Sequence, residues 1–415
     1  MSDAQDLERK LIYDWNTVNG GWELGREIHF DDETLRDGLQ SPSVHSPTIE
    51  EKIRILHLIA QIGIDSLDVG LPGAGPHVVK HVTALVKEIR DQKLDLRPNC
   101  AARTLLADIE PIAQISQEVG VKIEVSMFVG SSEIRKYTED WDLDSMMRNS
   151  EESLKFCQKE DLPVMYVTED TTRAHPDTIE KLYGLAIDYG AKRICFCDTV
   201  GHSTPEGAFN LITFATDLVK KKGRDVLIDW HGHSDRGLGI WNSIAALRAG
   251  ADRIHGCALG IGERVGNAPM DLMLVNLKLL GLLPDRIDLR VLPEYVETVS
   301  RCCRVPIPTN YPVFGSDAFE TGTGVHAAAV IKALRKGDDW LANRVYSGVP
   351  ADEVGREQKI RVGPMSGKSN VLYWLEKRGL DATDARVERI FQAAKESPRL
   401  LTDEEILHLV DESSN

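Results

Sequence analysis

The stretch VLIDWHGHSDRGLGIWNSIAALRAGADRIHGCA, residues 226–258, contains the pattern that decides the fold. Its first part, 226–232, is a run of the length and residue type of a strand, and 252–258 is a second candidate strand. Between them, 237–251 carries apolar residues at helical spacing. A strand, a helix and another strand in this order indicate parallel strands joined by a helical crossover.

The same alternation extends along the chain from residue 27 onward. Helical patterns separate the strands, for example at 48–63 and at 204–223, where Thr204 and Pro205 are typical of a helix start and Gly223 of a helix end. Eight strand-then-helix units in about 250 residues predict an α/β fold, a closed (β/α)8 TIM barrel. A doubly wound open sheet has the same periodicity, so it remains the alternative fold. The expected strands are 27–34, 65–71, 95–101, 121–128, 163–169, 192–198, 226–232 and 252–258.

The alternation of strand and helix patterns ends after residue 285, which indicates smaller parts appended to the barrel. We expect an N-terminal extension at 1–26, the catalytic barrel at 27–285, a linker with a first subdomain at 286–345 and a second subdomain at 346–415. Connections in this region are rich in proline, and 324–337 has the pattern of a short helix. The appended region is therefore expected to be small and rich in α-helix.

Composition excludes several classes of partner. The 415 residues include 49 Lys and Arg against 65 Asp and Glu, a formal net charge of −16 at pH 7. This acidic balance argues against nucleic-acid binding, which needs a concentrated basic face. No apolar run approaches the roughly 20 residues of a membrane span, and the N-terminus has no targeting pattern. The seven cysteines have neither zinc-knuckle nor disulfide spacing, so we expect reduced thiols in a cytoplasmic protein.

Polar residues at the carboxyl ends of barrel strands are the catalytic candidates in this fold. His231 and His233 end one strand, and because alternate residues of a strand point to the same side, both imidazoles suit one divalent metal. Asp37 follows the first strand and is a candidate metal ligand or base. Arg36 beside it suits a carboxylate or enolate oxygen. A surface ion pair is the alternative for these last two residues.

Three further residues are expected at the same end of the barrel, where the strands have their carboxyl ends. Glu169 ends the fifth strand and Thr199 follows the sixth, so both are candidates for contact with a small polar substrate. Either could equally be a helix cap. Asn267 lies in the glycine-rich stretch after the eighth strand and is a candidate to bond a ligand or reach the metal.

Together these motifs resemble the 2-isopropylmalate synthase and homocitrate synthase family, the Claisen-condensing branch of the metal-dependent aldolase-like TIM barrels. The resemblance spans nearly the whole chain and preserves the order of the motifs. GTGVHAAAVIKA resembles the family segment with the general-base histidine, here His326, and YSGVPADEVG places Tyr346 at the catalytic tyrosine. The barrel motifs are LRDG (35–38), EDTTR (169–173), DTVG (198–201), HGHSDRGLG (231–239) and GIGERVGNA (260–268).

The resemblance implies a mechanism. A divalent cation (Zn, Mn or Mg) would be held by Asp37, His231 and His233, with water or Asn267 nearby, and would be chelated by a 2-oxo acid. Arg36 would stabilise charge on the oxygen under attack, Thr199 would hold the carboxylate, and Glu169 would assist proton movement. His326 with Tyr346 would deprotonate the methyl group of acetyl-CoA, the co-substrate. The family also implies a homodimer in which the appended region completes the neighbour's site.

Some positions depart from the family pattern, and they lie where the substrate is selected. Leu39 replaces the usual acidic or polar residue after RDG, Ser234 replaces an asparagine, and Glu124 and Ser126 occur where relatives place a histidine. The chain also stops where the second subdomain ends, so we expect no C-terminal leucine-binding regulatory domain.

The expected reaction is therefore acyl transfer from acetyl-CoA to 2-oxoisovalerate, giving 2-isopropylmalate for leucine biosynthesis. Condensation with 2-oxoglutarate, pyruvate or oxaloacetate stays open, because Arg103 and Arg173 are available to bind a second carboxylate in the substrate. Selection of an aliphatic tail would instead use residues such as Leu71 and Met127, which are equally typical of barrel core. An acyl-CoA lyase and a catalytically silent 2-oxo-acid sensor are the remaining alternatives.

Overall fold

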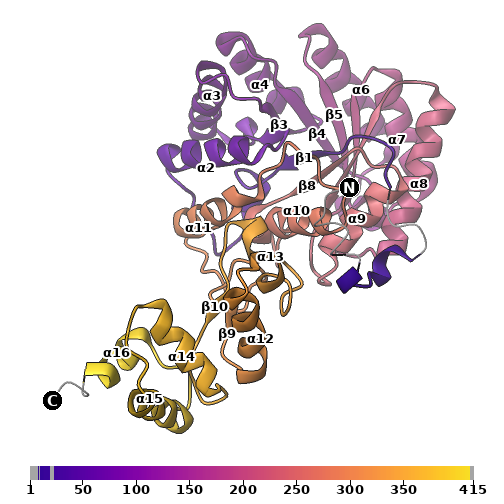
Figure 1. The fold of residues 1–415 in the computed structure, drawn as a ribbon. Coiled ribbons are helices and arrows are strands. Elements are labelled where there is room, and N and C mark those ends of the chain that lie inside the picture. The colour runs from indigo at the N-terminus through magenta and orange to yellow at the C-terminus, as the bar shows by residue number, and fades with distance from the viewer. Residues whose placement is uncertain (1–7, 9, 19–22, 412–415) are drawn as a thin grey trace. The chain divides into compact units, whose positions relative to one another are not determined.

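The computed structural model describes residues 8, 10–18 and 23–411, and within these ranges the chain forms a closed barrel of eight parallel strands (Figure 1). Each strand pairs with the next, and β8 returns to pair with β1, with His29 opposite Arg253. This closure confirms the predicted TIM barrel and excludes the open sheet. The strands are β1 (His29–Asp32), β2 (Ser66–Asp68), β3 (Arg97–Arg103), β4 (Glu124–Gly130), β5 (Val164–Glu169), β6 (Arg193–Asp198), β7 (Leu227–Gly232) and β8 (Arg253–Gly256).

Helices follow the strands and form a ring outside the barrel in which neighbours contact one another (Figure 1). The start and end signals of the sequence operate as expected in α8, where the Thr204 side chain accepts a hydrogen bond from the backbone of Gly207 and Gly223 takes a left-handed conformation. The ring contains α2 (Ile49–Ile62), α3 (Pro76–Asp91), α4 (Leu106–Val119), α6 (Leu143–Lys159), α7 (Pro176–Asp188), α8 (Pro205–Lys222), α9 (Gly239–Ala249) and α10 (Met270–Leu279). The short helix α5 (Glu133–Glu139) precedes α6.

Contacts divide the chain into two compact units. The first contains residues up to Asp288 together with Glu294–Val305, which includes most of α11 (Leu292–Cys303). The second contains Leu289–Pro293 and the residues from Pro306 onward. In the described part of the chain, no helix combines the length and apolar character needed to cross a membrane.

The second unit is built from short helices and a two-stranded parallel sheet. Its largest apolar cluster joins α14, α15 and α16 around Trp374, Leu375 and Ile390. A smaller cluster joins α12 to β10 through Val330, Ile331 and Ile360. The elements are β9 (Glu320–Thr321), α12 (Gly324–Arg335), α13 (Asp339–Ala342), β10 (Lys359–Ile360), α14 (Lys368–Lys377), α15 (Asp384–Glu396) and α16 (Asp403–Asp411).

The interior of the barrel contains a buried network of charges. Asp229 on β7 accepts hydrogen bonds from Arg193 at 2.7 Å and from Arg253 at 2.6 Å. Arg253, only 2% exposed, also donates to Glu124 at 2.7 Å and to the Ser66 hydroxyl at 2.9 Å. The two guanidinium groups hold the pKa of Asp229 far below its ordinary value even though burial alone would raise it.

Replacing Asp229 with alanine is expected to destabilise the barrel by about 3–5 kcal/mol, because it leaves two buried arginines without their shared partner. The shift of the urea unfolding midpoint at constant slope measures this loss. Lys122→Ala is the control, since its ammonium group is 65% exposed in its ion pair with Asp161 and its loss is expected to change stability by less than about 1 kcal/mol. Equal effects of the two variants would contradict a stabilising role for the network.

Candidate active site

A pocket of about 310 Å³ opens at the carboxyl end of the barrel, where this fold places its active sites. Each of the eight strands, or the loop that follows it, contributes to its wall. The lining residues are Glu33, Arg36, Asp37, Gln40, Leu71, Ala101, Ser126, Phe128, Met165, Val167, Glu169, Cys195, Cys197, Thr199, His231, His233, His255, Glu263 and Arg264.

Asp37, His231 and His233 converge on one point in this pocket. The Nε2 atoms of the two histidines are 3.4 Å apart. Asp37 Oδ2 lies 3.5 Å from Nε2 of His233 and 3.9 Å from Nε2 of His231. All three side chains are buried. The strand supplies this geometry: His231 lies on β7, and His233 follows two residues later on the same side.

The protonation of this cluster suits a divalent cation. Burial and the neighbouring His231 lower the pKa of His233 to about 4, so its imidazole is neutral at pH 7. Nδ1 of His231 faces the Glu33 carboxylate, which favours the proton on Nδ1 and leaves the Nε2 lone pair toward His233 and Asp37. Two imidazole nitrogens and one carboxylate oxygen at these distances form a donor set for such an ion.

Asn267 belongs to the same cluster. Its amide nitrogen donates to Asp37 Oδ2 at 2.7 Å and to the carbonyl oxygen of Ile261 at 3.0 Å, while its buried Oδ1 has no partner among the described residues. The loop can approach this closely because it is rich in glycine. A Cβ at Gly262 would overlap the Asn267 amide, and one at Gly266, where φ is +92°, would overlap the carbonyl of Gly260.

Arg36 is held by three carboxylates. Its Nη1 donates to Asp37 at 2.8 Å, its Nε to Asp68 at 2.8 Å, and its Nη2 forms a short ion pair with Glu33. Since a planar guanidinium bonded along several edges has little freedom to rotate, this side chain is fixed beside Asp37 at the pocket wall.

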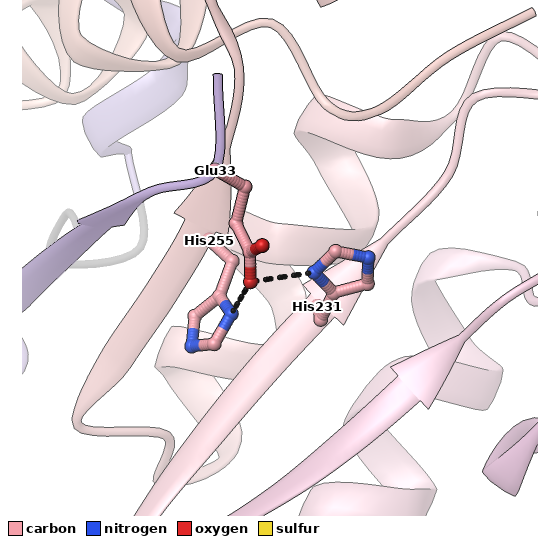
Figure 2. Close-up of side chains that lie close together, drawn as sticks. All are labelled: Glu33, His231 and His255. Carbon is pink, nitrogen blue, oxygen red and sulfur yellow. Dashed lines mark hydrogen bonds and ion pairs between the residues drawn. The ribbon is translucent and has the colours of Figure 1, made fainter. Parts of the chain in front are cut away.

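Figure 2 shows the Glu33 carboxylate between two imidazole rings. Its Oε1 lies 3.0 Å from Nδ1 of His255 and 3.6 Å from Nδ1 of His231, and Nε2 of His255 lies 3.1 Å from Asp229. Burial alone would lower the pKa of His255, but the neighbouring Cys195 and the carboxylates of Asp31, Asp229 and Glu33 hold the pKa well above its ordinary value. A protonated His255 and the Arg36 guanidinium already pair with the Glu33 carboxylate. Glu33, His231 and His255 are therefore a poor second site for a cation. Glu33 and His255 instead support His231.

Sequence reasoning missed Glu33, Asp68 and His255. The only available signal was position: Glu33 directly follows β1, Asp68 ends β2 and His255 lies on β8, so all three are near strand ends. No local spacing connects Glu33 to His255, which is 222 residues away.

The other barrel residues expected at the mouth divide into two groups. Glu169 and Thr199 line the pocket, and burial raises the pKa of Glu169. The Thr199 hydroxyl also accepts a hydrogen bond from the backbone of Asp170 at 2.8 Å. Arg173 is not part of the lining; its Nε and Nη2 each donate to the Asp170 carboxylate at 2.7 Å.

His326 and Tyr346 lie in the second unit, where they contact each other. Their rings stack with centroids 4.3 Å apart and planes 29° apart. His326 is the third residue of α12, and both side chains are exposed, Tyr346 by 49%. The structure therefore brings together the two residues that the resemblance names as a proton relay.

The chain resembles known proteins over most of its length. A family model described as HMGL-like matches residues 27–299. A probable 2-isopropylmalate synthase of Methanopyrus kandleri is 30% identical over 366 residues, covering 88% of this chain and 68% of that protein. A homocitrate synthase of the same organism is 30% identical and covers 90% and 88%. The Bacillus subtilis HMG-CoA lyase shares the fold, with a TM-score of 0.57 at 17% identity, over 68% of this chain and 96% of that chain.

Proposed function

Because the chain belongs to the HMGL-like family, we propose that it is an acyltransferase that condenses acetyl-CoA with a 2-oxo acid whose side chain is uncharged and apolar. The first candidate is 2-oxoisovalerate, which would give 2-isopropylmalate and CoA, the condensation of leucine biosynthesis. The relatives include synthases named for 2-isopropylmalate and for homocitrate at equal identity. The choice between them therefore rests on the pocket.

The observation that carries the choice is that the described pocket wall has no cation free for a second carboxylate. Besides the two histidines of the donor set, its basic residues are Arg36, His255 and Arg264. Arg36 pairs with three carboxylates, His255 lies between two, and Arg264 is bonded twice to Asp235. A substrate with a distal carboxylate would bury that charge unpaired, which is strongly unfavourable.

The remaining wall suits an apolar tail. It includes Leu71, Ala101, Phe128, Met165 and Val167. Met127, which the sequence offered for this role, is fully buried in the barrel and absent from the lining, because its neighbours Ser126 and Phe128 take the inward positions on β4.

The two arginines that left homocitrate synthesis as an alternative do not line the pocket. Arg103 donates to Asp108 through Nε at 2.7 Å and Nη2 at 2.9 Å, and Arg173 is bonded to Asp170 in the same way. Neither is part of the pocket wall. These pairs support an uncharged substrate tail over a charged one.

The site residues have separate roles in this proposal. Asp37, His231 and His233, with Asn267 beside them, would hold a divalent cation of the zinc, manganese or magnesium type. When bound, the cation would polarise the keto carbonyl of the 2-oxo acid. Arg36 places positive charge beside the oxygen under attack, and Thr199 donates a hydrogen bond to the substrate carboxylate. Glu169 transfers a proton at the buried mouth of the barrel. His326 with Tyr346 deprotonates the acetyl methyl group.

The proposal includes a homodimer in the cytoplasm. An exposed His326–Tyr346 pair needs a surface to exclude water before it can act on a weakly acidic methyl group, and a second copy of the chain would supply that surface. The seven cysteines all lie in the described part of the chain and are free, which supports a reducing compartment.

Release of free CoA from acetyl-CoA tests the proposed reaction directly. With a divalent cation present, we expect kcat/KM for 2-oxoisovalerate to exceed that for 2-oxoglutarate and oxaloacetate by at least about 100-fold, because an unpaired buried charge costs several kcal/mol. Protein treated with a chelator is the control. A preference for 2-oxoglutarate would contradict the substrate class but keep the condensation, whereas no CoA release with any 2-oxo acid would contradict the reaction.

Glu33 is expected to matter for metal binding although it is outside the donor set. Glu33→Gln should weaken divalent-metal binding by about 10–100-fold, because it removes the negative charge that orients the His231 ring through Nδ1. Calorimetric titration with Zn²⁺ or Mn²⁺ measures this change. Glu263→Gln is the matched control: it also removes a carboxylate of the pocket wall, but one that is 55% exposed and, among the residues that the structure describes, is paired only with Arg264 at 3.8 Å. Equal affinities of the two variants would show that Glu33 does not orient His231.

A further inference from the structure

Two cysteines of the pocket wall have no part in the proposed reaction. Cys195 and Cys197 occupy alternate positions on β6, and both line the pocket. Their sulfur atoms are 4.0 Å apart. The side chains are nearly buried, with exposures of 1% and 5%, so they are reached only through the pocket. The C-x-C spacing therefore produces a pair of thiols that face one cavity.

The surroundings of this pair are apolar toward β5, whereas the charged groups of His255 and Asp229 lie near Cys195. Met165 and Val167 on the neighbouring strand β5 pack against the two cysteines. Burial raises the pKa of the Cys195 thiol well above its ordinary value, so it stays protonated at neutral pH. Because thiolates rather than thiols attack thioesters and alkylating agents, Cys195 is a poor nucleophile. The pair is better suited to a ligand that has high affinity for sulfur and contacts both atoms.

A disulfide between these cysteines is disfavoured by the strand. Residues two apart on a strand have Cα atoms about 6.6 Å apart, near the upper end of the disulfide range of about 4.4–6.8 Å. Closing the sulfur atoms to a bond of about 2.05 Å would require the backbone to move. β6 is paired with β5 on one side and β7 on the other, which restrains that movement. An atom that bridges the two sulfurs needs less displacement.

We propose that Cys195 and Cys197 form a dithiol site, inside the substrate pocket, for soft thiophilic ligands of the trivalent arsenical class. A monosubstituted arsonous acid, R–As(OH)2, would form two As–S bonds and break two As–O bonds, releasing two water molecules with no change of oxidation state. Each thiol proton leaves in one of these waters. Soft ligands of this kind prefer sulfur to the imidazole and carboxylate donors of Asp37, His231 and His233. The adduct would occupy the pocket and exclude the 2-oxo acid.

Phenylarsine oxide, which hydrates to an arsonous acid, is the probe for this site. We expect the reduced full-length protein to take up one equivalent, detected by native mass spectrometry, with or without a chelator present. Cys197→Ala and Cys195→Ala should each weaken uptake by at least 100-fold, and saturating 2-oxoisovalerate should slow it. If Cys195→Ala fails to fold, Cys197→Ser near the mouth of the pocket tests the same pair.

The adjacent cysteines Cys302 and Cys303 provide the matched control. They are consecutive residues of the helix α11, so their side chains point about 100° apart around its axis. The double variant Cys302→Ala/Cys303→Ala should keep full uptake. Uptake that persists in the Cys195 and Cys197 variants, that is lost in this double variant, or that occurs only after unfolding would overturn the assignment.

Discussion

His233→Ala is expected to lose its bound divalent metal and its activity together. The substitution removes one of the three proposed metal ligands from a cluster whose nitrogen and oxygen atoms are 3.4–3.9 Å apart. We expect metal affinity to fall at least 100-fold and CoA release at least about 1000-fold, because the cation supplies several kcal/mol of stabilisation to the developing charge. Elemental analysis of the purified protein and the CoA-release assay measure the two effects.

A matched histidine variant separates this effect from general damage. The His175 side chain is 74% exposed, so His175→Ala removes an imidazole without touching the pocket. It should keep both metal and rate. A His233→Ala protein that retains one equivalent of metal and full turnover would exclude Asp37, His231 and His233 as the metal site.

His326→Ala is expected to lose turnover while keeping the substrate and the metal. If His326 removes the proton from acetyl-CoA, its loss should lower kcat by about 10²–10⁴-fold. Binding of 2-oxoisovalerate, measured by calorimetry, should change little, since the donor set belongs to the barrel unit and His326 to the second unit. Lys332→Ala is the control, because Lys332 is exposed on the same helix α12.

The same variant tests the homodimer. When His233→Ala and His326→Ala chains are expressed together, mixed dimers would contain one site with all its residues, so activity should return. Absence of recovery from mixed dimers would contradict sharing of the site between copies, whereas full activity of His326→Ala alone would exclude the proposed base.

Much of the barrel could be predicted because its signals are local. Parallel strands buried on both faces appear as short apolar runs, and the helices between them have their own caps, as Thr204 and Gly223 show for α8. The histidine pair could be predicted for the same reason, since the pleat of β7 places His231 and His233 on one side. Met127 was a candidate for either the pocket or the barrel core and lies in the core, a choice that the sequence leaves open because it does not show which alternate set of β4 points inward.

The arginines illustrate a limit of reasoning by residue type. Arg103 and Arg173 were considered available for a second carboxylate, yet each is paired within a few residues, with Asp108 and Asp170. These short spacings were visible in the sequence. What was not visible is that both side chains stay out of the pocket wall.

The sequence by itself determined the order of strands and helices and the motifs that contain Asp37, His231 and His233, because strand period, helix caps and loop glycines act over a few residues, whereas it left an open sheet as the alternative to a closed barrel. Tertiary structure alone decided the support of that cluster and the character of the pocket. Closing the barrel brings β8 beside β1, which places His255 against Glu33 and through it supports His231. Such contacts join residues about 200 positions apart, and their partners depend on register and packing that local spacing does not encode.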